Sequence, residues 1–340
     1  MTQTAPPTIS VILPFYNASA TLEEALESVA DQQFRDYEVI AVDDGSEDGG
    51  AALVEHHARR DRRIRLLRPG RRGLVSALNL GLKSASAPLI ARMDADDRMH
   101  PERLATQHRH MAEHPELTLA GTRVRLFPDA DIQSGFRAYM AWQERCLRPE
   151  DIAEEIYVES PIVHPSMIYR RQAVLALGGY REGMFPEDYD LVLRLHHTGH
   201  RMAKLDRVLL EWRESEHRLS RTDPRCSRTA FDRLRATFLR RDPRLRGRHL
   251  AIWGAGRKTR RRVQLLLDYG HRPVAWIDID PRKVGNRLNG VPVVDPEWLM
   301  GRRPRPFVLS YVANHGARDL IAWQLEAMGY RRGHDYLMVG

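Results

Sequence analysis

The chain has 340 residues, of which 42% are hydrophobic and 29% are charged, and its formal net charge is +8. This composition is typical of a globular protein with a sizeable core, and it excludes disordered and fibrous chains. Because no apolar run is long enough to cross a bilayer and residues 1–8 lack a signal-peptide pattern, we expect a cytoplasmic protein. The only cysteines, Cys146 and Cys226, indicate neither a disulfide framework nor a zinc site.

The positive charge is concentrated between Arg218 and Arg262. Such a surface attracts anionic partners, but charge alone does not distinguish nucleic acid, anionic lipid and small anionic substrates. Because the sequence contains no nucleic-acid-binding motif, we expect no nucleic-acid partner.

The first half of the chain alternates strand and helix patterns. Apolar, β-branched runs predict strands at residues 9–13, 37–42, 64–67 and 88–93. Helical spacing predicts a helix that begins at a capping box on Thr21 and another at residues 74–82. This alternation favours a parallel sheet covered by helices on both faces, in which ligands bind beyond the carboxyl ends of the strands.

Polar motifs follow three of these strands, at residues 14–17, 43–46 and 94–97, and we expect them to line one crevice. The last motif places Asp94, Asp96 and Asp97 within four positions. Three such carboxylates repel one another unless a divalent cation neutralises them, and hard oxygen ligands suit Mg²⁺ or Mn²⁺. The cluster therefore predicts a metal site for a diphosphate, with a solvated acidic turn as the alternative.

Four segments in order, residues 11–17 (VILPFYN), 42–49 (VDDGSEDG), 93–97 (MDADD) and 187–191 (EDYDL), resemble the signatures of inverting family 2 glycosyltransferases with the GT-A fold. The resemblance covers roughly the first two thirds of the chain. It implies sugar transfer from a nucleotide-sugar donor, a UDP-sugar by preference, to a hydroxyl of a cell-envelope glycan or lipid-linked acceptor. It does not identify the sugar.

The resemblance also implies roles for the donor-side residues. Tyr16 would stack on the nucleobase, and Asp44 would accept a hydrogen bond from its imino N–H. Pro14, Asp43 and Asn79 would complete the donor site. In the alternative interpretation Tyr16 only packs, the two aspartates build a turn, and Asn79 is an ordinary helical residue.

For the metal, the resemblance assigns Asp94 to ribose or metal contact and Asp96 to direct coordination of Mn²⁺ or Mg²⁺, with Asp97 as a neighbouring support. His217, in a later loop, would offer a further metal or diphosphate ligand. A plain surface histidine is the alternative for His217.

On the acceptor side, the resemblance identifies Asp188 as the catalytic base that deprotonates the acceptor hydroxyl. Glu187 and Asp190 would support it, and His164 and Ser166 would lie beside the acceptor. Alternatively, the three acids of this segment only occupy a helix N-terminus, where negative charge is favourable.

The C-terminal part reads as a β-α-β unit, with strands at residues 249–253 and 274–277 around a helix at 260–269. Gly254, Gly256 and Asp278 form a partial dinucleotide fingerprint, which predicts a second nucleotide site or, alternatively, a scaffold for docking and homo-oligomer formation. A dinucleotide-dependent, sugar-modifying oxidoreductase centred here is the alternative function. Because of Pro304, Pro306 and the short chain that remains, we expect little room for a full six-stranded dinucleotide domain.

These observations predict an α/β protein with a GT-A domain at residues 8–222, a basic linker helix at 223–246 and a smaller Rossmann-like α/β domain at 247–340. The GT-A domain would contain a mostly parallel sheet flanked by helices. In the linker, Phe231, Leu234 and Phe238 follow helical spacing. This stripe predicts either peripheral contact with the inner face of the membrane or packing within the protein.

Overall fold

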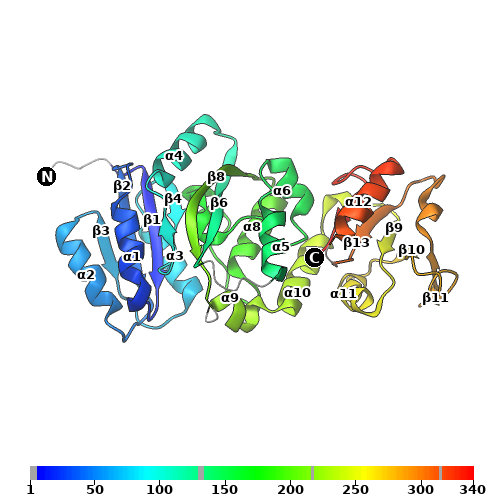
Figure 1. The fold of residues 1–340 in the computed structure, drawn as a ribbon, viewed down its shortest axis with the longest axis horizontal. Coiled ribbons are helices and arrows are strands. Elements are labelled where there is room, and N and C mark those ends of the chain that lie inside the picture. The colour runs from blue at the N-terminus through cyan, green and yellow to red at the C-terminus, as the bar shows by residue number, and fades with distance from the viewer. Residues whose placement is uncertain (1–5, 129–133, 216–217, 314–315) are drawn as a thin grey trace. The chain divides into compact units, whose positions relative to one another are not determined.

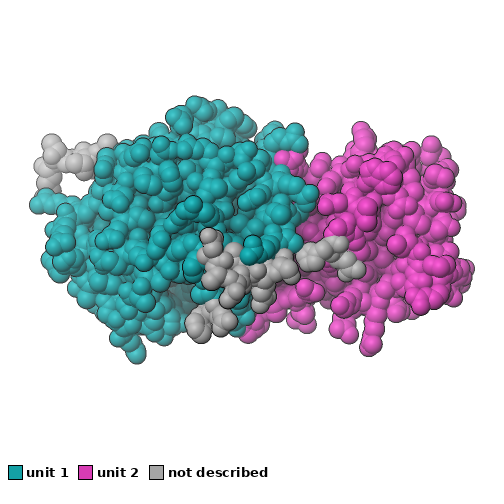
Figure 2. All heavy atoms as spheres, in the orientation of Figure 1, with its two compact units in different colours: residues 1–149, 162–183, 187–222 teal, residues 150–161, 184–186, 223–340 magenta. Residues whose placement is uncertain are grey.

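The computed structural model describes residues 6–128, 134–215, 218–313 and 316–340. The chain divides into two compact units, which Figure 2 colours separately. The first comprises residues 1–149, 162–183 and 187–222, and the second comprises residues 150–161, 184–186 and 223–340. Residues 150–161 and 184–186 thus belong to the unit that contains the C-terminal part, although they lie inside the range predicted for the GT-A domain.

The first unit contains a mostly parallel sheet. Its strands are β1 (Ile9–Phe15), β2 (Tyr37–Asp43), β3 (Ile64–Leu67), β4 (Leu89–Arg92), β5 (Arg98–Met99), β6 (Leu117–Phe127), β7 (Ile168–Arg170) and β8 (Arg201–Arg213). Its helices are α1 (Ser19–Ala30), α2 (Gly50–Arg60), α3 (Leu74–Ser84), α4 (Arg103–Glu113), α5 (Ser134–Gln143), α7 (Arg171–Ala176), α8 (Glu187–His197) and α9 (Leu219–Thr222).

The strands lie in the order β3-β2-β1-β4-β7-β6-β8-β5. Figure 1 labels β3, β2, β1 and β4 of this sheet in the blue to cyan part of the ribbon. The first four are parallel, β7 is antiparallel to both of its neighbours, β6 and β8 are parallel, and β5 is antiparallel to β8. The predicted α/β class and mostly parallel sheet are confirmed.

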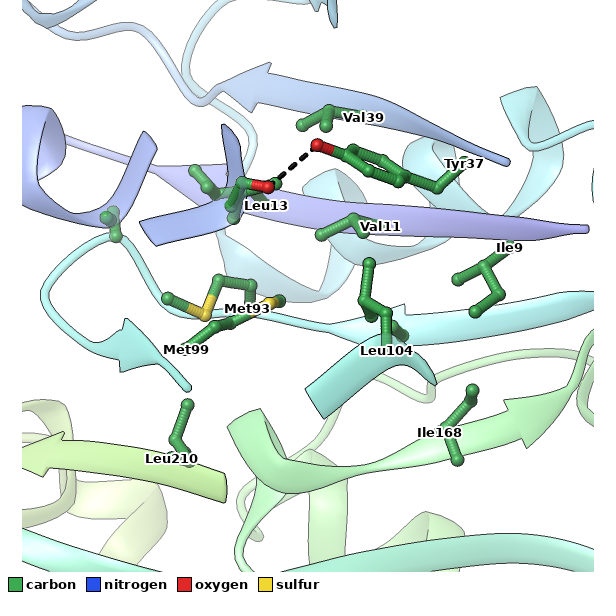
Figure 3. Packing of buried hydrophobic residues seen from close by; sticks show 14 of the residues in the cluster. Ile9, Val11, Leu13, Tyr37, Val39, Met93, Met99, Leu104, Ile168 and Leu210 are labelled. Carbon is green, nitrogen blue, oxygen red and sulfur yellow. Dashed lines mark hydrogen bonds between the residues drawn. The ribbon is translucent and has the colours of Figure 1, made fainter. Parts of the chain in front are cut away.

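Strand β1 is buried along its whole length. Ile9, Val11 and Leu13 alternate onto one face, where they join a core that includes Leu104 of α4 (Figure 3). Tyr37 closes this core and donates a hydrogen bond from its hydroxyl to the carbonyl oxygen of Val29 at 2.7 Å (Figure 3). A strand covered on both faces is mostly apolar, and the polar Ser10 inside β1 donates its hydroxyl to Glu38 at 2.7 Å.

The other face of β1 is covered by α3, which approaches closely at Gly81. A Cβ built on Gly81 would lie 2.6 Å from Cγ2 of Ile12. Gly81→Ala should therefore push α3 away from the sheet and destabilise the first unit by about 1–3 kcal/mol, measured as a lower urea midpoint. Gly135→Ala is the matched control, because a Cβ at this other helical glycine meets nothing within 4 Å. An equal midpoint for both variants would contradict the close packing of α3.

The predicted capping box at Thr21 is wrong. Helix α1 begins at Ser19, two residues earlier, and no side chain of its own caps it. Instead, Oδ2 of Asp48 accepts a hydrogen bond from the Ser19 amide at 2.7 Å. Thr21 donates its hydroxyl to the carbonyl oxygen of Ala95 at 3.0 Å, so it links α1 to the acidic motif rather than closing the helix.

The second unit contains its own α/β layer structure. Its strands are β9 (Leu250–Trp253), β10 (Pro273–Ile277), β11 (Arg287–Leu288), β12 (Val291–Val294), β13 (Phe307–Ser310) and β14 (Tyr336–Met338). Its helices are α10 (Arg228–Leu239), α11 (Arg257–Leu267), α12 (Ala317–Ala327) and most of α6 (Pro149–Glu155). The strands lie in the order β11-β12-β10-β9-β13-β14, with only β11 antiparallel in this described sheet.

This sheet has six strands, five of them parallel, where the sequence analysis expected little room for a full six-stranded dinucleotide domain. They fit because each is short, between two residues in β11 and five in β10. The predicted linker helix is α10, and it packs against α11 within this unit. Its buried residues include Leu234 and Leu239, which supports packing within the protein. None of the described helices combines the length and apolarity needed to cross a membrane.

Candidate functional site

The carboxyl ends of β1, β2 and β4 meet at one edge of the first sheet. The register pairs Phe15 with Asp43 and Ile12 with Arg92. Backbone hydrogen bonds continue past the strand ends, from the Asp44 amide to the Phe15 oxygen at 2.9 Å and from the Met93 amide to the Ile12 oxygen at 3.1 Å. The three polar motifs that follow these strands are therefore neighbours, as the parallel arrangement predicted.

The acidic motif forms a compact cluster of carboxylates. One carboxylate oxygen from each of Asp94, Asp96 and Asp97 lies within 4.8 Å of the others. Asp97 is only 1% exposed, and its Oδ1 accepts a hydrogen bond from the Arg213 amide at 2.8 Å. Its Oδ2 is buried and has no hydrogen-bond partner among the described residues. A buried, unpartnered carboxylate oxygen beside two further acids is a donor set that a divalent cation fits.

The electrostatics of the cluster agree with this fit. Burial and the neighbouring charge of Asp94 raise the pKa of Asp96 to about 6. Burial, followed by the charges of Asp94 and Asp96, raises the pKa of Asp97 well above its usual value. The raised pKa values show that the neighbouring arginines do not fully offset the burial and mutual repulsion of Asp96 and Asp97, as expected for groups that a cation would neutralise.

Arg92, which the sequence analysis did not single out, lies directly behind the cluster. Its guanidinium is buried, and Nη2 contacts Oδ1 of Asp94 at 2.5 Å. Arg103 is buried as well and donates to the Arg92 carbonyl oxygen at 2.9 Å. An arginine inside the otherwise apolar strand before Asp94 was the available signal, because a buried arginine requires an acidic partner.

Asp44 and Tyr16, the two residues that the resemblance assigns to the nucleobase, both contact the loop at residues 71–73. The Asp44 carboxylate accepts the Arg72 amide at 2.8 Å and the Gly73 amide at 2.9 Å, and it pairs with the Arg71 side chain. The same guanidinium lies 3.6 Å from the centre of the Tyr16 ring, which is 45% exposed. Arg71 therefore contacts both side chains that the sequence assigned to the nucleobase.

The remaining donor-side residues are more enclosed. Asp43 is 1% exposed, and its Oδ1 accepts the Ser46 amide at 2.7 Å, as in the alternative turn interpretation. Pro14 is buried within β1. Asn79 holds the backbone of Tyr180 through both of its side-chain polar atoms, at 2.8 and 2.9 Å. Direct contact of these residues with a donor stays a prediction.

Asp188 lies in the first turn of α8 and is half-buried. Its Oδ1 accepts the Tyr189 amide at 2.7 Å. Burial and the adjacent charge of Glu187 raise its pKa to about 7, and the positive charge of Arg92 acts in the opposite direction. Arg92 pairs with Asp94, and its charge also acts on the pKa of Asp188.

The other acceptor-side residues mainly position the loop before α8. Asp190 is buried and pairs with Arg181 and, at 2.8 Å, with Arg194. Arg194 also donates to the Gly179 carbonyl oxygen at 2.7 Å. These bonds hold the loop before α8 in place. Asp190 therefore neutralises the charges of Arg181 and Arg194 and, through Arg194, positions this loop. Glu187 is buried next to Asp188.

His164 and Ser166 lie in a buried polar network. His164 Nε2 is 2.9 Å from the Tyr180 hydroxyl, which is 3.2 Å from the Tyr169 hydroxyl. Burial, with a smaller effect from Arg92, lowers the pKa of His164 well below its usual value. Ser166 is fully buried and donates its hydroxyl to the Val163 oxygen at 2.7 Å. Their contact with an acceptor stays a prediction, and His217 lies outside the described residues.

In the second unit, the residues of the predicted nucleotide site are close together, but the Asp278 carboxylate already has hydrogen-bond and ion-pair partners within the protein. Its carboxylate accepts the amides of Ala255 at 2.9 Å and Asp280 at 3.0 Å, and it pairs with Lys283 at 3.0 Å. Gly254 has a φ of 110°, which a tight turn requires, whereas Gly256 faces open space. These contacts support the scaffold interpretation, and nucleotide binding here stays a prediction.

Comparison with known proteins places this site in a family. The family model for glycosyl transferase family 2 matches residues 10–178. The amylovoran biosynthesis glycosyltransferase AmsE of Erwinia amylovora is 30% identical over 207 residues, which is 60% of this chain and 75% of that protein. The putative glycosyltransferase EpsE of Bacillus subtilis is 31% identical over 220 residues, which is 63% of this chain and 76% of that protein.

A solved structure agrees at the level of the fold. S. aureus TarS 1–349 in complex with UDP-GlcNAc has a TM-score of 0.55 and 19% identity, covering 77% of this chain and 71% of that one. The fold agrees with a GT-A domain that carries an additional domain. With three of the ordered motifs at one sheet edge and two relatives matched over three quarters of their length, the chain belongs to glycosyltransferase family 2.

Proposed function

We propose that this glycosyltransferase is an inverting enzyme that moves a sugar from a UDP-sugar to a hydroxyl of a cell-envelope glycan or lipid-linked acceptor. The observation that carries the proposal is the cluster of Asp94, Asp96 and Asp97, with a buried and unpartnered Oδ2 on Asp97, at the carboxyl edge of the sheet. A relative named for amylovoran biosynthesis supports a glycan product, and a structural neighbour solved with UDP-GlcNAc suggests the donor class.

The acidic cluster would hold Mn²⁺ or Mg²⁺ through Asp94 and Asp96, with Asp97 as a further ligand. The unpartnered Oδ2 of Asp97 supports this larger role than the sequence predicted. When bound, such an ion would offset the negative charge of the diphosphate leaving group. Asp94 keeps one oxygen on Arg92, which would fix the direction of its carboxylate.

The reaction needs a base for the acceptor hydroxyl. As the acceptor oxygen forms its bond to the anomeric carbon, the bond from that carbon to the diphosphate oxygen breaks and the electron pair leaves with the diphosphate. The hydroxyl proton passes to the Asp188 carboxylate, whose raised pKa makes it a stronger base than an ordinary aspartate. Attack from the face opposite the leaving group inverts the anomeric carbon.

Binding of the donor is the direct test of this function. In calorimetric titrations against a panel of UDP-, GDP- and dTDP-sugars, we expect a UDP-sugar to bind in the presence of MnCl₂ and to bind at least about tenfold more weakly in excess EDTA. Equal affinity in Mn²⁺ and EDTA would contradict the metal role. Failure of every nucleotide sugar to bind in Mn²⁺ would contradict the donor assignment.

The pH dependence of turnover tests the base. Asp188 must be ionised to accept the proton, and its pKa is raised to about 7. At saturating donor, acceptor and Mn²⁺, kcat should therefore rise about tenfold per pH unit below 7 and level off above about pH 8. A profile that is flat between pH 5.5 and 8, with an unchanged fold by circular dichroism, would exclude a base with this pKa.

A further inference from the structure

The second unit contains a hollow of about 300 Å³ whose walls are mainly basic. Its ionisable lining residues are Arg240, Asp242, Arg246, Arg248, His271 and Arg272. They come from the end of α10, the turn that follows it, and the segment between α11 and β10. Because these segments lead into β9 and β10, the hollow lies at the amino ends of two parallel strands. Gly254 and Asp278 follow the carboxyl ends of the same strands, so the hollow is separate from the predicted nucleotide site.

The one acid in the lining is already neutralised. Asp242 pairs with Arg244 at 2.7 Å and accepts the Tyr157 hydroxyl at 2.8 Å. Burial alone would raise the pKa of Asp242, but the hydrogen bonds and charge of Arg244 lower it to about 2. This carboxylate therefore does not compensate the arginines that face the hollow.

Those arginines carry excess positive charge. Arg248 lies 3.4 Å from Asp335. Within the described ranges, by contrast, Arg240, Arg246 and Arg272 have no carboxylate within 4.0 Å. Three uncompensated guanidinium groups around one small hollow repel one another, and an anion between them would remove that repulsion.

A purely structural explanation accounts for only part of this arrangement. Arg240 donates to the Thr237 oxygen at 3.3 Å, and Arg272 donates to the Leu267 oxygen at 2.8 Å, so both help to close helix ends. Arg246 is exposed, and its side chain makes no hydrogen bond to any described residue. His271 donates from Nε2 to the Arg240 oxygen at 3.2 Å, which fixes the wall of the hollow.

We propose that this hollow is a binding site for a phosphate-bearing anion with one or two phosphate groups. Guanidinium groups present paired N–H donors that match phosphate oxygens. A volume of about 300 Å³ is at the lower end for small-molecule sites, so it suits a phosphate ester or diphosphate better than a whole nucleotide sugar. The anion comes either from a soluble phosphate compound or from a lipid headgroup.

Calorimetry with inorganic pyrophosphate in excess EDTA tests the site in the full chain. EDTA keeps the acidic cluster of the first unit free of metal, so pyrophosphate is not held there. The wild type is expected to bind, and Arg246→Gln/Arg272→Gln should weaken binding by about tenfold for each arginine removed. The matched control is Arg233→Gln/Arg241→Gln, which removes the same charge from two exposed arginines outside the hollow and should bind like the wild type.

Two outcomes would overturn the proposal: no pyrophosphate binding by the wild type, or equal weakening in both double variants. Co-sedimentation with vesicles that contain phosphatidylglycerol distinguishes the two sources of the anion. Vesicle binding that pyrophosphate displaces and that only Arg246→Gln/Arg272→Gln loses identifies a lipid headgroup. Pyrophosphate binding without vesicle binding identifies a soluble phosphate compound. UDP-sugar binding in Mn²⁺ should stay unchanged in both variants, so failure here does not affect the proposed transferase function.

Discussion

Asp188→Asn is expected to lower kcat by about 10²–10⁴-fold and to leave the affinity for the donor unchanged. An asparagine has nearly the same shape, and its carbonyl oxygen can still accept the Tyr189 amide that Asp188 accepts at 2.7 Å. It cannot take up a proton from the acceptor hydroxyl. Single-turnover transfer and calorimetric donor titration on the same preparation separate the chemical step from binding.

Glu182→Gln provides the control for this variant, because Glu182 is an exposed acid on the segment just before α8. It should transfer sugar at close to the wild-type rate. If Asp188→Asn also keeps a rate close to that of the wild type, another group is the base. If it instead loses donor binding, Asp188 contributes to the donor site and the assignment of roles is wrong.

Asp96→Ala should have the second large effect, on the order of a 100-fold loss of affinity for the donor in Mn²⁺. The variant removes one of the clustered carboxylates, so the remaining acids hold the cation more weakly. The expected effect on donor binding in EDTA is small, because without the cation Asp96 has no favourable contact to lose. Calorimetry in both conditions measures the difference.

The stability of this variant is a second readout. A carboxyl group whose pKa is raised in the folded state stabilises the fold below its unfolded pKa, and that stability is lost as the pH rises through about 6. At pH 8 without metal, Asp96 is therefore a destabilising charge, and Asp96→Ala should melt no lower than the wild type. A large drop in melting temperature would show a structural role, and unchanged donor affinity in Mn²⁺ would exclude metal binding by Asp96.

The sequence was sufficient for those features that follow from local pattern. Mostly apolar, β-branched runs indicated β1, β2 and β4, because these strands are buried, and the parallel arrangement then placed their polar ends at one edge. Helix α3 follows its periodicity to within two residues of the predicted end. The order of the parallel strands was therefore enough to predict that Asp44 and the acidic cluster lie at the same edge of the sheet.

Features that depend on distant contacts were missed. Helix α1 begins at Ser19, whose amide donates to Asp48, 29 positions later in the sequence. The local pattern at Thr21 therefore predicted the wrong start for this helix. The partners of Asp44 come from residues 71–73, and those of Asn79 come from Tyr180, which is 101 positions away. The sequence motifs therefore indicated Asp44 and Asn79 as candidate donor-binding residues, but they did not show that both side chains already have protein partners.

The position of Arg71 has a consequence for selectivity. Its guanidinium covers the Tyr16 ring and also pairs with Asp44, so an internal cation already occupies the two groups proposed for the nucleobase. A nucleobase bound at these two groups, as proposed above, would displace this cation. Only a ligand that offers both an aromatic face and a correctly placed N–H replaces both contacts, so partial mimics such as ribose phosphates should compete poorly. Arg71 would thus act as an internal competitor that sharpens the choice of donor.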